Sequence, residues 1–344
     1  MFRILCLAGG GLRGAFGIGL LEEFERRSDE PLCAYFDLVA GTSTGSITAS
    51  AICAGLTMTQ IREFYEEHAA RIFHPRDPYA PRNKLRMVYP LVRRLGKRRG
   101  QDPDAFFQSR YCPHSLTAAL EEGFGDRTLR DAKRCRLIVP TVNLTDGMTA
   151  VLRTPHLPIE TPTFDWRLVD VIVASSAAPT YFPHKRMPDG NDYVDGGIWA
   201  IDPGVVALAE AVRVTEQCCR TEDRPFDLND VSMLSIGTGQ ATYSLAPPEG
   251  DAGMLFWSRH IANVMSVSQV QGAQLPLHIV LGDRYQQIDF PLEDPSWTLD
   301  NIDMTAELFE LGRQRGAELY ESLQGRFLDE VTATYEPYQV GGRH

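Results

Sequence analysis

The sequence has no pair of cysteines at a spacing typical of a metal site or a redox motif. Its seven cysteines are an odd number, scattered along the chain, with no C-x-x-C and no metal-ligand spacing to neighbouring histidines. This pattern indicates neither a disulfide framework nor a zinc site. We interpret the cysteines as reduced thiols of a cytoplasmic protein, and we expect no metal and no cofactor.

Long apolar runs and net positive charge are also missing. No uninterrupted apolar run reaches the roughly 18–20 residues that span a bilayer, so any membrane contact is expected to be peripheral. The net charge of −11 opposes attraction of the whole surface to nucleic acid or anionic lipid. We therefore expect no DNA or RNA polymer as a partner. The apolar start carries one basic residue and several glycines, and is interpreted as a first strand and turn rather than a signal peptide.

Strands and helices alternate in the predicted pattern. Apolar runs at 2–8, 35–40, 136–142 and 231–236 predict buried strands, and helical spacing is found at 15–27 and 46–55. This alternation is typical of an α/β protein with a largely parallel sheet. Later residues predict a helix near 254–270, a strand near 284–290 and a helix near 302–323.

The length of the chain predicts an insertion. With 344 residues it exceeds the roughly 250–300 that one hydrophobic core usually serves. Residues 57–130 are mostly helical in pattern and are interrupted by prolines, which indicates a helical cap insertion. We expect one domain over 1–325 that includes this cap, followed by a tail over 326–344 that frays.

A tight turn is predicted where the second strand ends. The sequence Gly41-Thr42-Ser43-Thr44-Gly45 matches G-x-S-x-G, in which a serine occupies a strained strand-to-helix turn and the two glycines avoid clashes. The next helix points its N-terminus at this turn, where free N–H groups favour negative charge. Ser43 is the candidate nucleophile, although the pattern also occurs by chance in ordinary turns.

Glycines also follow the first strand. The segment GGGLRG contains Gly9, Gly10, Gly11, Arg13 and Gly14 and satisfies G-x-G-x-x-G, which is also typical of a dinucleotide-binding turn. That alternative needs an acidic residue at the end of the second strand, where this chain has the serine turn instead. We favour an anion nest beside Ser43 in which these residues form an oxyanion hole, because two adjacent strand-turn-helix units put both turns at the same sheet edge.

A convincing histidine for a Ser-His-Asp triad is missing. His260 falls in a predicted amphipathic helix and His278 in an apolar segment, and the other histidines stand in no motif. By contrast, Asp195 is followed by Gly196 and Gly197, which let the backbone turn and expose the carboxylate. Burial beside a serine hydroxyl can raise the pKa of an aspartate from about 3.9 and make it a usable base. The same three residues also form simple turns.

Together these motifs resemble the patatin-like phospholipase family. Besides the segments at 9–14, 41–45 and 195–197, the stretches ASSAAPTYFP (174–183) and LSIGTG (234–239) are similar to motifs of the family and occur in the same order. The resemblance covers about residues 3–240. It implies a three-layer α/β/α sandwich.

The resemblance also implies roles for individual residues. Ser43 would be the nucleophile and Asp195 its base, and the N–H groups around Gly10 and Gly11 would form the oxyanion hole, with Arg13 as a supporting cation. One departure is Ala8, where many members of the family carry an aspartate. That carboxylate is not the catalytic one, so the departure leaves the expected activity in place.

The activity expected from this resemblance is that of a lipid acyl hydrolase of the phospholipase A type. The chain is also similar to patatin-like effectors of bacterial anti-phage systems, which implies activation by a cyclic dinucleotide. Three alternatives stay open: a general carboxylesterase or lysophospholipase, a nucleotide-binding protein that uses the glycine turn, and an inert lipid-binding module.

A basic segment suggests how the chain meets its partners. Residues 82–99 hold eight Lys or Arg and no acid, interleaved with apolar residues. This segment could dock on anionic headgroups, hold the phosphates of a regulatory ligand, or form a solvated helical face. The expected partners are a phospholipid membrane surface, a cyclic dinucleotide and a second copy of the chain. The expected location is the cytoplasm, with transient contact with the inner membrane.

Overall fold

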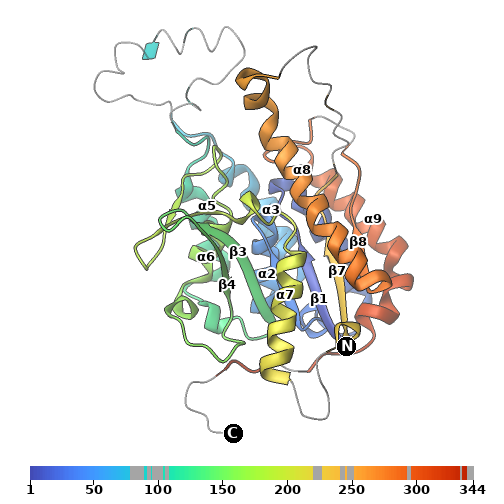
Figure 1. Ribbon diagram of the computed structural model, residues 1–344. Coiled ribbons are helices and arrows are strands. Elements are labelled where there is room, and N and C mark those ends of the chain that lie inside the picture. The colour runs from blue at the N-terminus through green and yellow to red at the C-terminus, as the bar shows by residue number, and fades with distance from the viewer. Residues whose placement is uncertain are drawn as a thin grey trace.

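One sheet runs through the part of the chain that a computed structural model describes (Figure 1). The described residues are 1–77, 89–90, 94, 104, 108–219, 227–240, 245, 252–292, 296–333 and 335–338. The strands are β1 (Phe2–Leu7), β2 (Leu38–Gly41), β3 (Arg136–Asn143), β4 (Met148–Arg153), β5 (Lys185–Arg186), β6 (Asp192–Asp195), β7 (Val231–Ile236) and β8 (Tyr285–Ile288). Their order is β5-β6-β3-β2-β1-β7-β8, and β4 also pairs with β3.

The centre of the sheet is parallel. Strands β3, β2, β1, β7 and β8 run in one direction, whereas β4, β5 and β6 are antiparallel to their neighbours. The predicted α/β class with a largely parallel sheet is therefore confirmed. The antiparallel strands were not predicted, because they are short or only partly buried and lack a continuous apolar run.

Helices cover both faces of the sheet. They are α1 (Ala15–Arg27), α2 (Thr44–Ala54), α3 (Met58–Ile72), α5 (Pro113–Phe124), α6 (Leu168–Ser175), α7 (Gly204–Val214), α8 (Met254–Leu281) and α9 (Thr305–Leu323). Successive side chains of a strand point to opposite faces. In β1, Leu5 and Leu7 join a core with α1, α3 and α9, while Ile4 and Cys6 join a second core with α7 and α8. The predicted three layers are confirmed, with α7 and α8 in front of the sheet in Figure 1.

The predicted cap falls partly outside the described residues. Its two ends form α3 and α5, and apolar side chains of both, such as Ile61 and Leu120, belong to the same core as α1. Most of residues 78–107 lie outside the described part of the chain, so the limits of the cap stay a prediction. The same holds for the basic segment 82–99, of which only residues 89, 90 and 94 are described.

The expectation of a frayed tail after residue 325 is wrong for its described part. Phe327 and Leu328 are buried, and the ring of Phe327 stacks on Phe36 at 6.5 Å between centroids. The N–H of Thr332 also donates to the carbonyl of Ala34 at 2.8 Å. Apolar burial against the N-terminal part of the chain holds this segment, and a local sequence pattern does not reveal that long-range contact.

Long helices of the described chain are not membrane spans. Within the described residues, no helix combines the length and the apolar character needed to cross a bilayer.

Candidate functional site

The serine turn and the glycine turn leave the sheet side by side. Strands β1 and β2 are parallel neighbours, with Leu7 opposite Gly41, so both chains turn at the same edge. Ser43 itself has φ 53° and ψ −123°, a conformation that is unfavourable for a residue with a side chain. Strain of this kind persists only where the surroundings enforce it, and it is common at functional sites.

The two glycines of the serine turn are required by close approach. A Cβ on Gly41 would lie 2.2 Å from the carbonyl oxygen of Gly45, and a Cβ on Gly45 would lie 2.2 Å from that of Leu7. Neither distance leaves room for a carbon atom. The glycines therefore allow α2 to begin directly at the end of the sheet, with Ser43 at its N-terminus.

Strand β6 brings the aspartate to the serine. Ile138 of β3 pairs with both β2 and β4, and Thr141 pairs with both β4 and β6. Because a strand has only two edges, β2 and β6 must occupy successive parts of the same edge of β3. Where β2 ends, β6 arrives in the opposite direction, and its last residue, Asp195, stands next to the turn that carries Ser43.

Ser43 and Asp195 are hydrogen-bonded directly. The hydroxyl of Ser43 donates to Oδ2 of Asp195 at 2.8 Å, with no histidine between them. The N–H of Gly197 donates to Oδ1 at 2.7 Å, so both carboxylate oxygens are held. Burial raises the pKa of Asp195 to about 6, and these two hydrogen bonds only partly offset the effect. A carboxylate with this pKa and geometry can accept the proton of the serine hydroxyl at neutral pH.

Gly196 allows the carboxylate strand to approach β3. A Cβ at this position would lie 2.2 Å from the carbonyl oxygen of Pro140. Gly197 makes a different contribution, because its N–H is a hydrogen-bond donor to Asp195. The structure therefore gives a role to both glycines that follow Asp195 in the predicted turn.

Ser175 holds the backbone of the serine turn. Its buried hydroxyl oxygen accepts the N–H of Ser43 at 3.1 Å and donates its own proton to the carbonyl of Pro140 at 2.7 Å. The hydroxyl thus links the strained turn to β3. A second brace comes from Ser46, whose hydroxyl donates to the carbonyl of Ser43 at 2.6 Å.

The glycine turn offers two unused N–H groups. The N–H of Gly9 donates to the carbonyl of Ile201 at 2.9 Å, so this group is not free to bind an oxyanion, and the prediction for Gly9 is corrected accordingly. Within the described residues no acceptor is recorded for the N–H groups of Gly10 and Gly11. A Cβ on Gly9 would lie 3.1 Å from that of Ser43, which shows how closely the two turns approach.

The shape of the glycine turn depends on its neighbours. A Cβ on Gly10 would lie 2.2 Å from the hydroxyl oxygen of Thr238, and this hydroxyl donates to the carbonyl of Gly9 at 2.7 Å. Gly11 has φ +58°, and a Cβ there would lie 2.2 Å from the carbonyl oxygen of Leu299. Glycine is therefore needed at both positions, at one for space and at the other for space and conformation.

Arg13 and Gly14 stabilise the glycine turn through their contacts. Nε of Arg13 donates to the carbonyl of Gly10 at 3.4 Å. Burial lowers the pKa of Arg13, and the nearby carboxylate of Asp289 partly opposes that shift. Gly14 packs against α2, since a Cβ there would lie 2.8 Å from the hydroxyl oxygen of Thr44.

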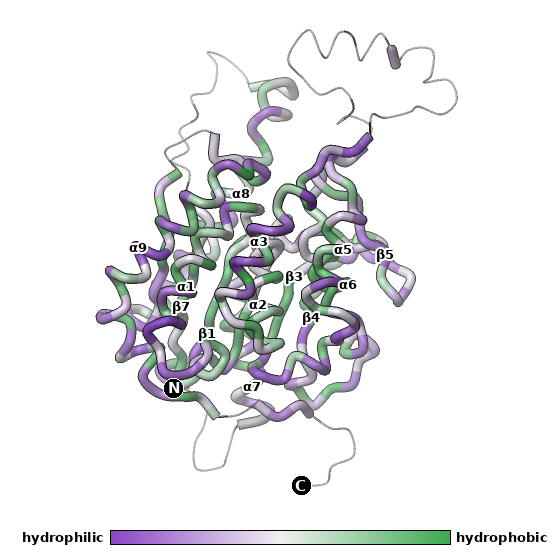
Figure 2. The backbone as a smooth tube through the Cα atoms, turned by 180° about the vertical axis from the view of Figure 1, so that it is seen from behind, coloured by the Kyte–Doolittle hydropathy of each residue, from purple (hydrophilic) through white to green (hydrophobic). Residues whose placement is uncertain are grey.

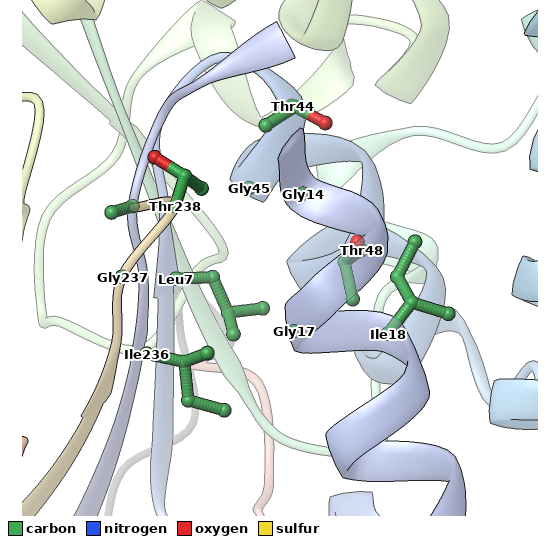
Figure 3. Close-up of a pocket in the computed structure, with 11 residues that line it drawn as sticks. Leu7, Gly14, Gly17, Ile18, Thr44, Gly45, Thr48, Ile236, Gly237 and Thr238 are labelled. Carbon is green, nitrogen blue, oxygen red and sulfur yellow. The ribbon is translucent and has the colours of Figure 1, made fainter. Parts of the chain in front are cut away.

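A small pocket lies between α1, α2 and the ends of β1 and β7 (Figure 3). Leu7 and Ile236 line the pocket on the side of the strands, and Ile18 of α1 lies next to Thr48 of α2 on the opposite side. Neither Ser43 nor Asp195 lines this pocket. It therefore adjoins the serine turn without giving access to the hydroxyl.

His156 is a buried structural histidine. Its Nδ1 lies 2.8 Å from the hydroxyl of Thr154 and its Nε2 lies 2.9 Å from Oε1 of Glu210, an order that imitates a triad. Thr154 is 0% exposed, so its hydroxyl cannot meet a substrate. Burial is also the main reason why the pKa of His156 is lowered. This chain of bonds joins β4 and the segment after it to α7.

One group of possible metal ligands is found among the described residues. Side-chain donors of Glu67, His68 and Glu122 lie within 4.8 Å of one another on α3 and α5. However, Arg71 already pairs with Glu122 at 2.7 Å, and the His68 ring packs on Phe64 at 4.8 Å. Helix packing and an ordinary ion pair account for this group.

Sequence reasoning missed three side chains of the site. Ser175 and Thr238 stand in two of the quoted motifs, but a motif does not tell which hydroxyl points at the turns. Asp289 follows β8 and accepts the N–H of Gly239 at 2.7 Å; burial raises its pKa to about 6. No local signal marks it, because it reaches the glycine turn only through the folding of the sheet.

A mixed sheet flanked by helices, with a serine on a strained strand-to-helix turn that is hydrogen-bonded to a buried carboxylate, is an arrangement found in the class of serine acyl hydrolases. The family model described as patatin-like phospholipase matches residues 5–203. The chain belongs to the patatin-like phospholipase family.

Curated relatives agree with this assignment. The cGAMP-activated phospholipase of Vibrio cholerae serotype O1 is 33% identical over 281 residues, which is 78% of this chain and 74% of the relative. A cGAMP-activated phospholipase of Pseudomonas aeruginosa is 29% identical over 84% of this chain and 78% of the relative. A cUMP-AMP-activated phospholipase of Escherichia coli is 26% identical over 92% of this chain and 90% of the relative.

Proposed function

We propose that this protein is a phospholipase of the A type that cleaves acyl esters of membrane phospholipids, with Ser43 as nucleophile and Asp195 as base. The observation that carries the proposal is the 2.8 Å hydrogen bond from the Ser43 hydroxyl to the buried carboxylate of Asp195. Membership of the patatin-like phospholipase family supports the choice of substrate.

The reaction proceeds through an acyl-enzyme. Asp195 accepts the proton as the oxygen of Ser43 bonds to the ester carbonyl carbon, and the N–H groups of Gly10 and Gly11 bind the oxyanion. The protonated Asp195 then gives its proton to the leaving alcohol, which is the lysophospholipid. Water, deprotonated by the same carboxylate, attacks the acyl-enzyme and releases the fatty acid and free Ser43.

Vesicle hydrolysis tests the substrate class. Purified protein is incubated with vesicles of phosphatidylethanolamine and phosphatidylglycerol, and fatty acid and lysophospholipid are measured by mass spectrometry. We expect both products from the native protein and neither from the Ser43→Ala variant. Cleavage of soluble short-chain esters without cleavage of either lipid would favour the alternative of a general carboxylesterase.

A cyclic dinucleotide activates this hydrolysis in our proposal. Two relatives are named for activation by cGAMP and a third for activation by cUMP-AMP. We expect cGAMP to raise vesicle hydrolysis by at least tenfold, on the order of the coupling that 1–3 kcal/mol provides. The rate is measured with cGAMP, with cUMP-AMP and, as the control, with the non-cyclic mononucleotide AMP. Equal rates in all arms would remove activation from the proposal.

Ser175 is predicted to be a positioning residue of the site. Ser175→Ala leaves the N–H of Ser43 without its acceptor, so we expect kcat to fall about tenfold or more, with KM nearly unchanged. The free energy of unfolding should also fall by about 1–3 kcal/mol, because buried polar groups lose their partners. Steady-state kinetics and urea unfolding measure the two effects.

The neighbouring serine provides the matched control for this variant. The hydroxyl of Ser176 is buried and has no recorded partner among the described residues. Ser176→Ala should therefore keep the kcat of the native protein. Equal losses in the two variants would show that the effect of Ser175→Ala comes from general packing.

The membrane and a second copy of the chain complete the proposed partners. We place the enzyme in the cytoplasm, with transient contact with the inner membrane. Its catalytic domain includes the helical cap. The basic segment 82–99 is one source of this contact. Neutralising Arg93, Arg94, Lys97 and Arg98 together should then weaken sedimentation with anionic vesicles.

A further inference from the structure

Helix α8 exposes a stripe of large apolar side chains. The helix has 28 residues, of which Arg259 is the only one that carries a permanent charge. In its first half, Met254 is 87% exposed, Trp257 41%, Ile261 43% and Met265 51%. At about 100° per residue these four positions fall within roughly 80° of the helix circumference. They form one continuous face, which we call the α8 stripe.

The α8 stripe lies on the part of the helix that projects from the domain. Leu277 and Leu281 at the other end are buried in the core beneath α7 and α8. A short connection joins the end of α8 to the start of β8, which runs parallel to β7. The buried end of α8 therefore lies at the edge of the sheet opposite the two turns. The first half of α8 extends past the edge where the parallel strands end, and both views show this (Figures 1 and 2).

Helix α8 is also tied to the turn that carries the carboxylate. Nε2 of Gln269 donates to the carbonyl of Ile198 at 2.6 Å. Ile198 is three residues after Asp195 and is itself 41% exposed. An exposed apolar side chain therefore also lies beside the turn that carries Asp195, where α8 is attached.

We propose that the α8 stripe docks on the surface of a phospholipid bilayer and holds the edge that carries Ser43 against its substrate; this inference rests on the proposed function. Lipid suits the stripe because its apolar side chains can insert beside acyl chains without electrostatic attraction, which the net charge of −11 opposes for the surface as a whole. Tryptophan and other large apolar side chains on one face of a helix insert at the boundary between headgroups and acyl chains. A monomeric soluble protein rarely exposes such a continuous apolar face without a partner.

The experiment compares two sets of glutamines on the same helix. Glutamine is a good helix former, so it removes apolar surface while keeping α8 intact. The test variant replaces Met254, Trp257, Ile261 and Met265. The matched control replaces Leu275 and Ile279, which are 63% and 73% exposed near the anchored end of the same helix.

Vesicle binding is measured first by sedimentation in a Ser43→Ala background, so that no substrate is consumed. Vesicles contain phosphatidylethanolamine and phosphatidylglycerol, and binding is repeated at about 0.5 M salt, where contacts between exposed charges are largely screened. We expect the test variant to bind about tenfold or more weakly at both salt concentrations. The control variant should bind like the parent.

Hydrolysis and mass in solution separate the remaining outcomes. With Ser43 restored and cGAMP present, the test variant should lose vesicle hydrolysis but cleave dispersed 4-nitrophenyl butyrate at the parental rate. Parental vesicle binding by the test variant would overturn the docking proposal. So would a dimer, detected by light scattering, that both glutamine sets dissociate, because a second copy would then cover α8. If the parent binds vesicles but cleaves neither substrate, the proposed function fails while the docking surface stands.

Discussion

Asp195→Asn is expected to lower kcat for acyl ester hydrolysis by about 10²–10⁴-fold, because the amide cannot accept the proton of Ser43. The variant should nevertheless fold, since its amide oxygen can still accept the N–H of Gly197, as Oδ1 of Asp195 does at 2.7 Å. Hydrolysis of a chromogenic ester by native and variant protein measures the loss. Retention of more than a tenth of the native rate would contradict the role of Asp195 as base.

The same substitution should stabilise the protein at neutral pH. Burial raises the pKa of Asp195 from 3.8 to about 6, so the folded state holds its proton more tightly than the unfolded state. The stabilising contribution of the protonated group is present below pH 4 and is lost as the pH rises through about 6. At pH 8 the charged carboxylate therefore costs up to about 3 kcal/mol, which asparagine avoids. Unfolding of both proteins at pH 5 and pH 8 should show the larger difference at pH 8.

The activity of the native enzyme should follow the same pKa. Because Asp195 must be ionised to accept a proton, kcat/KM should rise with pH and level off above an apparent pKa of about 6. Asp202 offers a matched control. It is also buried, accepts the N–H of a glycine two residues later at 2.8 Å and accepts a serine hydroxyl at 3.2 Å, but that serine is Ser235. Asp202→Asn should keep the acidic limb of the profile in place.

Gly10→Ala is expected to lower kcat by about 10²–10³-fold, the usual effect of losing an oxyanion donor. The new Cβ would lie 2.2 Å from the hydroxyl oxygen of Thr238, so the turn must move and its N–H groups must lose their alignment. Single-turnover measurements of acylation detect this loss directly. The free energy of unfolding should change much less than the activation free energy of acylation.

A second substitution distinguishes this steric explanation from a general effect on folding. The three atoms nearest to the added Cβ, at 2.2 to 3.0 Å, all belong to the side chain of Thr238, so Thr238→Gly removes the closest clashes with the alanine. The double variant should be at least tenfold more active than the Gly10→Ala variant. Thr238→Gly alone also removes the hydrogen bond to Gly9 and serves as the reference. No recovery in the double variant would argue against displacement of the glycine turn.

Local patterns were sufficient for the elements that surround the site. The helix at 15–27 and the strand at 231–236 have the predicted ends, because one follows a helical spacing and the other is a short continuous apolar run. Helix α8 is longer than predicted and ends at Leu281. Its second half contains Pro276 and carries apolar residues on its exposed face as well as on its buried face. The sequence there therefore shows no amphipathic pattern. Antiparallel β4 and β6 depend on pairing with β3, which no local pattern reveals.

The sequence by itself determined the residues of the candidate site: a serine and glycines at fixed spacings, an aspartate before two glycines, and no histidine in a suitable motif. Short-range steric needs explain part of this, because a Cβ on Gly41 would collide with the carbonyl of Gly45 only four residues later. Tertiary structure alone decided which groups meet. The pairing of β6 with β3 brings Asp195 within 2.8 Å of Ser43, and the hydroxyl of Ser175 reaches the serine turn across 132 residues. Long-range strand pairing and burial set these distances, so residues that are far apart in sequence share one site.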